Sequence, residues 1–195
     1  MKLATAFSAL AAVAALAAVA AFTTAAQAAS ISGLAIADAG LKAKGTLAVS
    51  SPRIAAGGAI PEVYSSYGKS VSPPLAWSKG PAGTRSYALI IEDPDAPMAT
   101  PFVHWMVWNL PAGATTLAEG AVPAGARQGK LMFVGKTGYV GPRPPAGGSH
   151  HYHVQVFALD RTLDLPDGAE RPALAGAMTG HVLASGELIA SFQKP

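Results

Sequence analysis

The sequence predicts a mainly β protein, a two-sheet antiparallel β-sandwich with a C-terminal helix. Three observations support this prediction. The chain has 21 glycines and 16 prolines among 195 residues, spread along its length, as is typical of many short strands joined by turns. Several short segments are strongly apolar, and two of them are apolar on both faces. Only one segment, late in the chain, has convincing helical spacing.

The clearest strand candidates are residues 86–91, 103–108 and 152–159. The first two segments are apolar on both faces, so we place them in the middle of a sheet that is covered on both sides. Residues 45–49 and 188–192 are weaker strand candidates. Such a set of strands is expected to form a sandwich in which most neighbours are antiparallel.

One helix is expected near the C-terminus. Pro172 suits the first turn of a helix, and apolar residues recur at helical spacing from Leu174 to Val182, until Gly186 stops the pattern. Before this helix, residues 120–150 are predicted to form a long and irregular loop rich in glycine and proline. Loops of that length are usually functional.

The N-terminal segment, residues 1–28, is predicted to be a signal peptide. Lys2 is followed by an apolar run over residues 3–22 and by the small-x-small sequence Ala26-Gln27-Ala28, which is typical of a cleavage site. A membrane-spanning helix is the alternative, since about 20 apolar residues can cross a bilayer. Cleavage would leave one domain, residues 29–195, in the periplasm or outside the cell.

The composition excludes several classes of function. Fourteen basic and 11 acidic residues give a net charge of only +3, which is too small and too scattered for a nucleic-acid-binding surface. The chain has no cysteine. This absence excludes a disulfide scaffold, a thiolate metal site, a cysteine nucleophile and a lipoprotein anchor.

A stiff acidic loop is expected directly after the first buried strand. It reads Asp93-Pro94-Asp95-Ala96-Pro97, so two carboxylates alternate with two prolines that lack an amide donor. An ordinary turn is the alternative interpretation, because Asp-Pro pairs are common in turns.

A histidine lies near the start of the next predicted strand. Strict alternation would place His104 on the face of Met106 and Trp108. A neutral imidazole there needs partners for both ring nitrogens, and Asp93 or Asp95 could supply one from the neighbouring strand end. A satisfied core histidine without a functional role is the alternative.

The Gly/Pro-rich segment before the third predicted strand is the third unusual stretch. Gly141 is expected to let a ligand approach the backbone, and the prolines around it fix the shape of the loop. Alternation along the following strand puts His150 and Tyr152 on one face, and His151 and His153 on the other. For the second pair, a solvated strand face is the alternative interpretation.

Together, these stretches could bring an acidic residue, two histidines and a rigid loop to one end of the sandwich. Protonated imidazoles and exposed backbone amides attract a small oxyanion, and affinity is then expected to rise as the pH falls through about 6.5. No hydroxyl or thiol is placed as an evident nucleophile. We therefore expect a binding pocket without a cofactor rather than an enzyme.

The ordered motifs resemble the phosphatidylethanolamine-binding protein family, in its bacterial Raf-kinase-inhibitor-like branch. The matching segments are Val71–Trp77, Asp93–Pro97, His104–Asn109, Gly141–Pro145, His150–Tyr152, Ala158–Asp160 and Gly180–Ala184. The resemblance implies a β-sandwich with a small pocket for phosphate-like anions. The pocket residues that it implies are Asp93, Pro97, His104, Gly141, Arg143 (through its backbone amide), Pro144, Pro145, His150 and Tyr152.

The sequence also departs from that family pattern. Bacterial relatives often carry Cys-Asp-Gly where this chain has Ser66-Tyr67-Gly68, so the acid at position 67 is missing. They often carry cysteine at the position of Arg143, and Asn-Asp-Phe-Gly near residues 131–135. Support of the loop near the pocket could therefore differ. Arg143 either adds a positive charge at the pocket rim or points to solvent.

Several ligands and partners stay open. The first is a phosphate-like anion or a phosphorylated head group. The second is a metal ion held by Asp93 or Asp95 with His104 and His150. The third is a protein partner, a kinase or protease of the kind that some family members regulate or inhibit, and a homodimer is a further alternative.

Overall fold

The computed structural model describes residues 33–131 and 135–195. Six strands form the larger sheet: β1 (Gly45–Thr46), β4 (Ser86–Asp93), β5 (Phe102–Pro111), β7 (Arg127–Gln128), β8 (Ser149–Leu159) and β9 (Val182–Gln193). Three strands form the smaller sheet: β2 (Val49–Ser50), β3 (Leu75–Trp77) and β6 (Thr116–Leu117). The helices of the described residues are α1 (Arg171–Met178) and the short 3-10 helices η1 (Ala35–Ala37), η2 (Ala39–Leu41) and η3 (Glu62–Tyr64).

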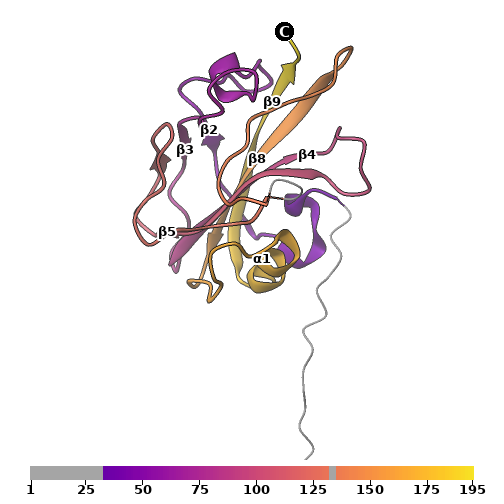
Figure 1. Cartoon of the computed structure of the whole chain (residues 1–195). Coiled ribbons are helices and arrows are strands. Elements are labelled where there is room, and N and C mark those ends of the chain that lie inside the picture. Colours follow the sequence, from indigo (N-terminus) through magenta and orange to yellow (C-terminus); the bar gives the residue numbers. More distant parts are fainter. Residues whose placement is uncertain (1–32, 132–134) are drawn as a thin grey trace, which may run out of the picture.

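The two sheets confirm the predicted fold class (Figure 1). The strand order is β1-β9-β8-β4-β5-β7 in the larger sheet and β2-β3-β6 in the smaller one. Neighbouring strands are antiparallel, except that β1 runs parallel to β9. No helix of the described residues is long and apolar enough to span a membrane. The predicted signal peptide, residues 1–28, lies outside the described residues.

The central strands β4 and β5 are buried on both faces, as their sequences predict. Tyr87, Leu89 and Ile91 of β4 belong to the core between the two sheets. Ala88 and Ile90 belong to a second core, which α1 and the N-terminal 3-10 helices close on the opposite face. The larger sheet is thus the middle layer of the molecule, so its strands read as continuous apolar runs.

The helix is shorter than the sequence pattern predicts. It begins at Arg171, with Pro172 in its first turn, and ends at Met178 rather than near Gly186. Gly180 takes a positive φ of 79° and turns the chain. The chain then enters β9, which confirms and extends the strand predicted at residues 188–192.

The strand predicted at residues 45–49 is wrong in one respect, because it is split between the two sheets. β1 pairs with β9 in the larger sheet, and β2 pairs with β3 in the smaller sheet. Where the chain crosses, a Cβ atom on Gly186 would lie 2.0 Å from the Leu47 carbonyl oxygen. A glycine at position 186 therefore serves close backbone approach within a strand rather than the end of a helix.

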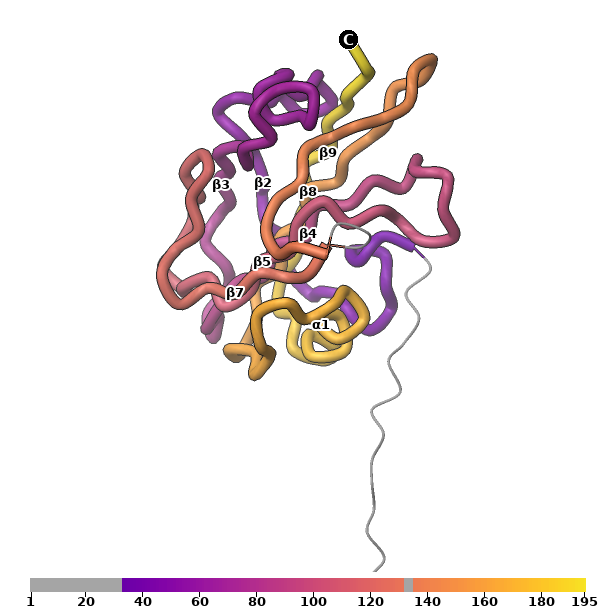
Figure 2. Tube along the Cα trace, viewed as in Figure 1, coloured from indigo at the N-terminus to yellow at the C-terminus, as the bar shows by residue number. Residues whose placement is uncertain are grey.

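Two connecting segments lie at the same end of the larger sheet. The connection from β4 to β5 and the segment leading into β8 project on the same side of the molecule (Figure 2). In the expected loop, residues 120–150, the described residues form β7 and the first two residues of β8 and are otherwise largely irregular. This end of the sheet carries the candidate site.

Candidate functional site

The candidate site is a pocket where β4 ends and β5 and β8 begin. These ends meet because β4 is antiparallel to both neighbours, with Asp93 opposite Phe102 and Glu92 opposite His153. The cavity has a volume of about 480 Å³. Its lining consists of Ser66, Asp93, Ala96, Pro97, Met98, Phe102, His104, Val140, Gly141, Arg143, Pro144, Pro145 and His150. Eight of the nine residues predicted for the pocket are among them, and Tyr152 is the exception.

A β-bulge sets the direction of His104. Ile91 pairs with Trp105 and Glu92 pairs with Val103, so His104 is an extra residue without a partner on β4. The expectation that His104 shares a face with Met106 and Trp108 is therefore wrong. Bulges shift the side-chain alternation by one residue and re-aim a side chain.

The His104 ring is buried and held by its neighbours. Its Nδ1 lies 2.8 Å from the Val140 carbonyl oxygen, so this partner, and not Asp93 or Asp95, takes the first ring nitrogen. The rings of Phe102 and Tyr152 lie 4.8 and 5.1 Å from its centroid. Burial lowers the pKa of His104, although the Val140 carbonyl acts in the opposite direction. The burial of His104 therefore disfavours the positive charge that was expected on this imidazole.

Tyr152 supports the site from behind. Its ring lies edge-on to that of His104, and both line a much smaller cavity beneath the pocket. The Tyr152 hydroxyl is buried and has no hydrogen-bond partner within the described residues. Burial raises the pKa of Tyr152, so the hydroxyl keeps its proton. Tyr152 therefore packs against His104 and does not itself line the pocket, in contrast to the expectation for this residue.

His150 and Asp93 form the polar wall of the pocket. The Nδ1 atom of His150 lies 2.8 Å from Oδ2 of Asp93. The other carboxylate oxygen, Oδ1, accepts hydrogen bonds from the amides of Asp95 and Ala96 at 2.8 and 3.1 Å. Asp93 thus orients the imidazole and shapes the acidic loop at once, as expected for a carboxylate that supports the site.

The loop carrying Gly141 is held by a segment that the sequence reasoning missed. The Ser66 amide donates to the Pro142 carbonyl at 2.9 Å, and the Gly141 amide donates to Oγ of Ser70 at 2.8 Å. A Cβ atom on Gly141 would lie 2.4 Å from the Tyr64 carbonyl oxygen. The expectation that Gly141 serves the approach of a ligand is therefore corrected. Its lack of a side chain admits the backbone at residues 64–66, and its amide is already bonded.

Tyr67 occupies the position at which the resemblance implies an acid, and it supports the same loop. Its hydroxyl donates to the Pro144 carbonyl at 2.9 Å. Its ring stacks on that of Phe192, with centroids 6.1 Å apart. The sequence showed the departure at position 67. No local sequence pattern predicted that Ser70 would accept a hydrogen bond from the Gly141 amide.

The second pair of histidines lies outside the pocket. His151 donates through its amide and bonds through Nδ1 to Oδ2 of Asp95, each at 2.7 Å. His153 pairs with Glu187 at 2.9 Å. The predicted alternation along β8 is confirmed, and the interpretation of a solvated face holds for His151, whose side chain is 57% exposed.

The rim of the pocket is apolar with one cation. Arg143 is exposed and also lines the cavity, and Met98 is 36% exposed. The Arg143 amide makes no hydrogen bond to the described residues, and the flanking prolines have no amide hydrogen to donate. The mouth therefore combines proline and methionine surface with a positive charge.

The metal alternative is not supported. Within residues 33–131 and 135–195, no group of three or more histidine, aspartate or glutamate side chains could hold a metal ion. Asp93 is committed to His150, and Asp95 to His151, while His104 turns its Nδ1 to a carbonyl. The carboxylates and imidazoles thus form separate pairs and do not converge on one point.

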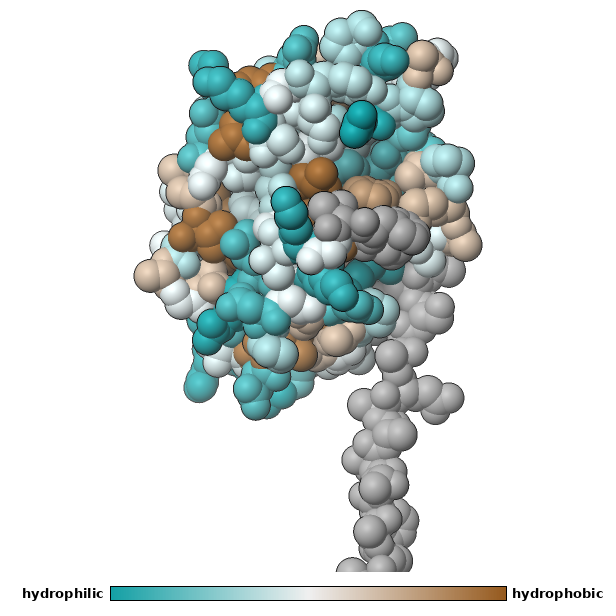
Figure 3. Space-filling view, in the orientation of Figure 1, coloured by the Kyte–Doolittle hydropathy of each residue, from teal (hydrophilic) through white to brown (hydrophobic). Residues whose placement is uncertain are grey.

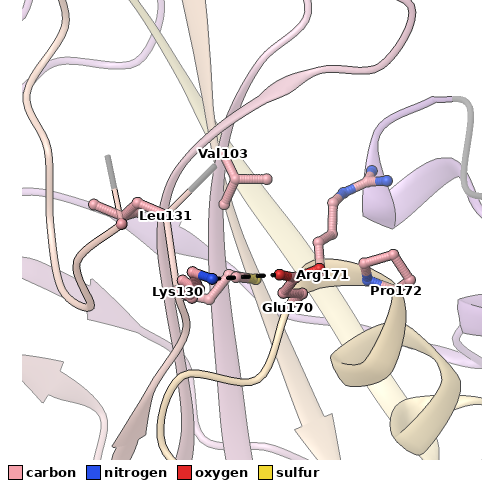
Figure 4. A pocket seen from close by; sticks show the side chains of 8 residues that line it. Val103, Lys130, Leu131, Glu170, Arg171 and Pro172 are labelled. Carbon is pink, nitrogen blue, oxygen red and sulfur yellow. Dashed lines mark ion pairs between the residues drawn. The ribbon is translucent and has the colours of Figure 1, made fainter. Parts of the chain in front are cut away.

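A second cavity, also of about 480 Å³, lies beside α1 (Figure 4). Its charged groups are paired, because Lys130 lies 3.9 Å from Glu170 and Arg171 bonds to the buried Glu92. Figure 4 shows the Arg171 side chain pointing away from Lys130 and Glu170. None of the predicted pocket residues lines this cavity, so it is not the candidate site.

Comparison with known proteins agrees with the motifs and the fold. The family model described as phosphatidylethanolamine-binding protein matches residues 50–193. The chain is 43% identical over 143 residues to the UPF0098 protein PH1269 of Pyrococcus horikoshii, covering 69% of this chain and 71% of that one. It is 38% identical over 148 residues to a Mycobacterium tuberculosis protein named as lipoprotein LppC, covering 75% and 72%.

Two solved structures share the fold. The phosphatidylethanolamine-binding protein homologue CT736 of Chlamydia trachomatis aligns with a TM-score of 0.72 and 36% identity, covering 77% of this chain and 99% of that one. YbcL of E. coli, described as a member of the mammalian PEBP family, aligns with a TM-score of 0.71 and 30% identity, covering 76% and 99%. The chain belongs to the phosphatidylethanolamine-binding protein family, in its bacterial and archaeal branch.

Proposed function

We propose that this chain is an exported protein that binds a small phosphate-like anion or a phosphorylated head group between His104 and His150. One observation carries the proposal. Both imidazoles line the same cavity, and each uses Nδ1 for a bond within the protein. Their Nε2 atoms are left for a ligand, which is a typical arrangement for orienting a small polar group.

The surroundings suit a small group with an apolar remainder. Pro97, Pro144 and Met98 line the cavity beside the polar wall, and Arg143 adds a positive charge at the exposed rim. An anionic head would face the imidazoles and the Arg143 amide, while an attached carbon chain would lie against the prolines. We propose binding rather than catalysis, because no hydroxyl nucleophile next to a base lines the pocket among the described residues.

Export is part of the proposal. The apolar run over residues 3–22 with its small-residue exit supports it. The name of the lipoprotein LppC from Mycobacterium tuberculosis is consistent with export in a relative. Fusion of residues 1–32 to a reporter enzyme that is active only outside the cytoplasm would test this part, and a silent fusion would contradict it.

A protein partner is a further part of the proposal, as a kinase or protease that contacts the pocket rim, or as a second copy of the chain. On the face shown in Figure 3, apolar surface is divided into small patches by polar side chains. Such a surface favours a weak, rim-centred contact over a large obligate interface. We therefore place ligand binding first.

Calorimetric titration of phosphoethanolamine and inorganic phosphate into the protein tests the proposed function. We expect both to bind, and His150→Asn to lose at least tenfold in affinity. An asparagine amide can still donate to Asp93 from the position of Nδ1, but it has no atom in place of Nε2. His181→Asn is the matched control, because His181 pairs with Asp160 and does not line the pocket. No heat with either ligand, or unchanged binding by His150→Asn, would contradict the proposal.

A further inference from the structure

The hydrogen-bond polarity of His104 restricts what the pocket can bind. The Nδ1 atom faces the Val140 carbonyl oxygen at 2.8 Å. A carbonyl oxygen only accepts, so Nδ1 carries the hydrogen. In a neutral imidazole the other nitrogen then has a lone pair and no hydrogen. Burial lowers the pKa of His104 and so favours that neutral state.

The lone pair on Nε2 of His104 is open to the cavity. Nε2 has no hydrogen-bond partner among the described residues. Among the described residues, the fully buried side-chain nitrogen and oxygen atoms without a hydrogen-bond partner belong to Trp77, Trp108 and Tyr152. Nε2 of His104 is not one of them, so it is not fully buried. His104 lines the pocket and also the much smaller cavity behind it, and we assign the opening at Nε2 to the pocket. The wall thus offers a hydrogen-bond acceptor at the place where an anion would have to lie.

The neighbouring groups do not change this polarity. The negative charge of Asp93 raises the pKa of His104, against the larger effect of burial. Both Asp93 oxygens already accept hydrogen bonds, from His150 and from the loop amides. Tyr139 and Tyr152 are uncharged, because burial raises the pKa of each. Arg143 is exposed at the rim. None of these groups supplies Nε2 of His104 with a proton, so the donor must come from the ligand.

We propose that the pocket selects a phosphoryl group that keeps one proton, with its P–OH donating to Nε2 of His104 and an unprotonated oxygen accepting from the Nε2–H of a His150 imidazolium whose Nδ1–H is held by Asp93. This inference rests on the proposed function and specifies it. A phosphomonoester in its monoanionic form has both a hydroxyl donor and anionic oxygens. A phosphodiester or a sulfate ester has the same charge without the donor, so it would place an oxygen lone pair against that of Nε2.

Three small esters separate these cases. Methyl phosphate, dimethyl phosphate and methyl sulfate are all singly charged at about pH 5, below the second phosphomonoester pKa of about 6. Only methyl phosphate carries a hydroxyl. We expect calorimetry at that pH to show methyl phosphate binding at least tenfold more tightly than either of the other two, because an unpaired buried acceptor is costly.

The preference is expected to weaken as the pH rises. Toward about pH 8, methyl phosphate loses the proton that donates to His104, since its second pKa is about 6. Methyl sulfate and dimethyl phosphate have no proton to lose. Dimethyl phosphate and methyl sulfate therefore serve as references for changes in the protein, and the affinity ratio reports the ionisation of methyl phosphate, in which we expect loss of the donor to outweigh the added negative charge. We expect this ratio to fall severalfold between the two pH values.

His104→Asn tests the residue itself. The asparagine amide can still donate to the Val140 carbonyl but has no acceptor in place of Nε2. We expect the ratio of methyl phosphate to methyl sulfate affinity to fall to about twofold or less, with His181→Asn leaving the ratio unchanged. The comparison of the three esters on the unmodified protein stands even if His104→Asn does not fold.

The outcomes separate the two proposals. If all three esters bind with similar affinity, or if the unprotonated esters bind more tightly, the proposed function stands and this selectivity is overturned. If none of the three binds, the proposed function fails and the selectivity with it. Tighter binding of dimethyl phosphate would also identify a lipid-like phosphodiester, rather than a free monoester, as the ligand type.

Discussion

His150 and His151 are consecutive residues of β8 with opposite surroundings. Each bonds through Nδ1 to a carboxylate of the same acidic loop, at 2.8 Å to Asp93 and at 2.7 Å to Asp95. The His150 and Asp93 side chains are 11% and 5% exposed, whereas those of His151 and Asp95 are 57% and 40% exposed. Similar geometry therefore occurs once inside the pocket wall and once at the surface.

The difference shows that burial, and not the pairing itself, decides what each pair can do. A water-exposed pair gains little, because solvent screens the attraction and competes for the hydrogen bonds. A buried pair cannot exchange its partner for water, so it fixes the orientation of the ring. The inner pair is thus suited to present Nε2 of His150 to a ligand, while the outer pair fastens the acidic loop to β8.

Removal of the inner carboxylate is expected to have the largest effect. Asp93→Ala removes the acceptor of His150 and of the Asp95 and Ala96 amides. We expect the free energy of unfolding to fall by about 2–3 kcal/mol, because a buried polar group is left without its partner. Urea unfolding at neutral pH measures this loss. Asp95→Ala is the matched control, and equal losses in the two variants would contradict the distinction between the pairs.

Removal of the outer carboxylate is expected to cost at most about 1 kcal/mol, as for exposed ion pairs. Burial alone would raise the pKa of Asp95, but the hydrogen bonds from the ring and amide of His151 lower it below its usual value. The stabilisation is therefore present above the unfolded pKa of about 3.9 and is lost as the pH falls through the lowered folded pKa.

A pH series sharpens this second prediction. We expect the difference in unfolding free energy between the unmodified protein and Asp95→Asn to persist down to about pH 4 and to vanish at lower pH. Unfolding curves of both proteins across that range provide the measurement. A difference that stays constant into strong acid would mean that the carboxylate charge of Asp95 contributes nothing.

Much of the site could be predicted because antiparallel strands bring distant motifs to one sheet end. The acidic loop follows β4 from its last residue, Asp93, and His104 and His150 lie near the starts of β5 and β8. Once these segments are recognised as neighbouring strands, the meeting of their side chains follows. The alternation along β8 also places His150 inward and His151 outward without any tertiary information.

The features that escaped prediction depend on contacts outside the local pattern. The bulge at His104 adds one residue to β5, which an alternation argument counts as regular. Ser70 and the backbone at residues 64–66 reach Gly141 across about 70 residues of sequence. The helix pattern continued past Met178 because alternating burial in β9 overlaps with helical spacing for a few residues.

The most direct test of the account observes the imidazole rings themselves. Two-dimensional ¹H–¹⁵N spectra of the histidine side chains can be recorded while methyl phosphate is added at about pH 5, where its second proton is retained. We predict that the resonances of His104 and His150 shift together along one saturation curve, while those of His151, His153 and His181 stay in place. Unmoved His104 and His150 resonances, or equal shifts of all five, would contradict the claim that these two rings form the binding site.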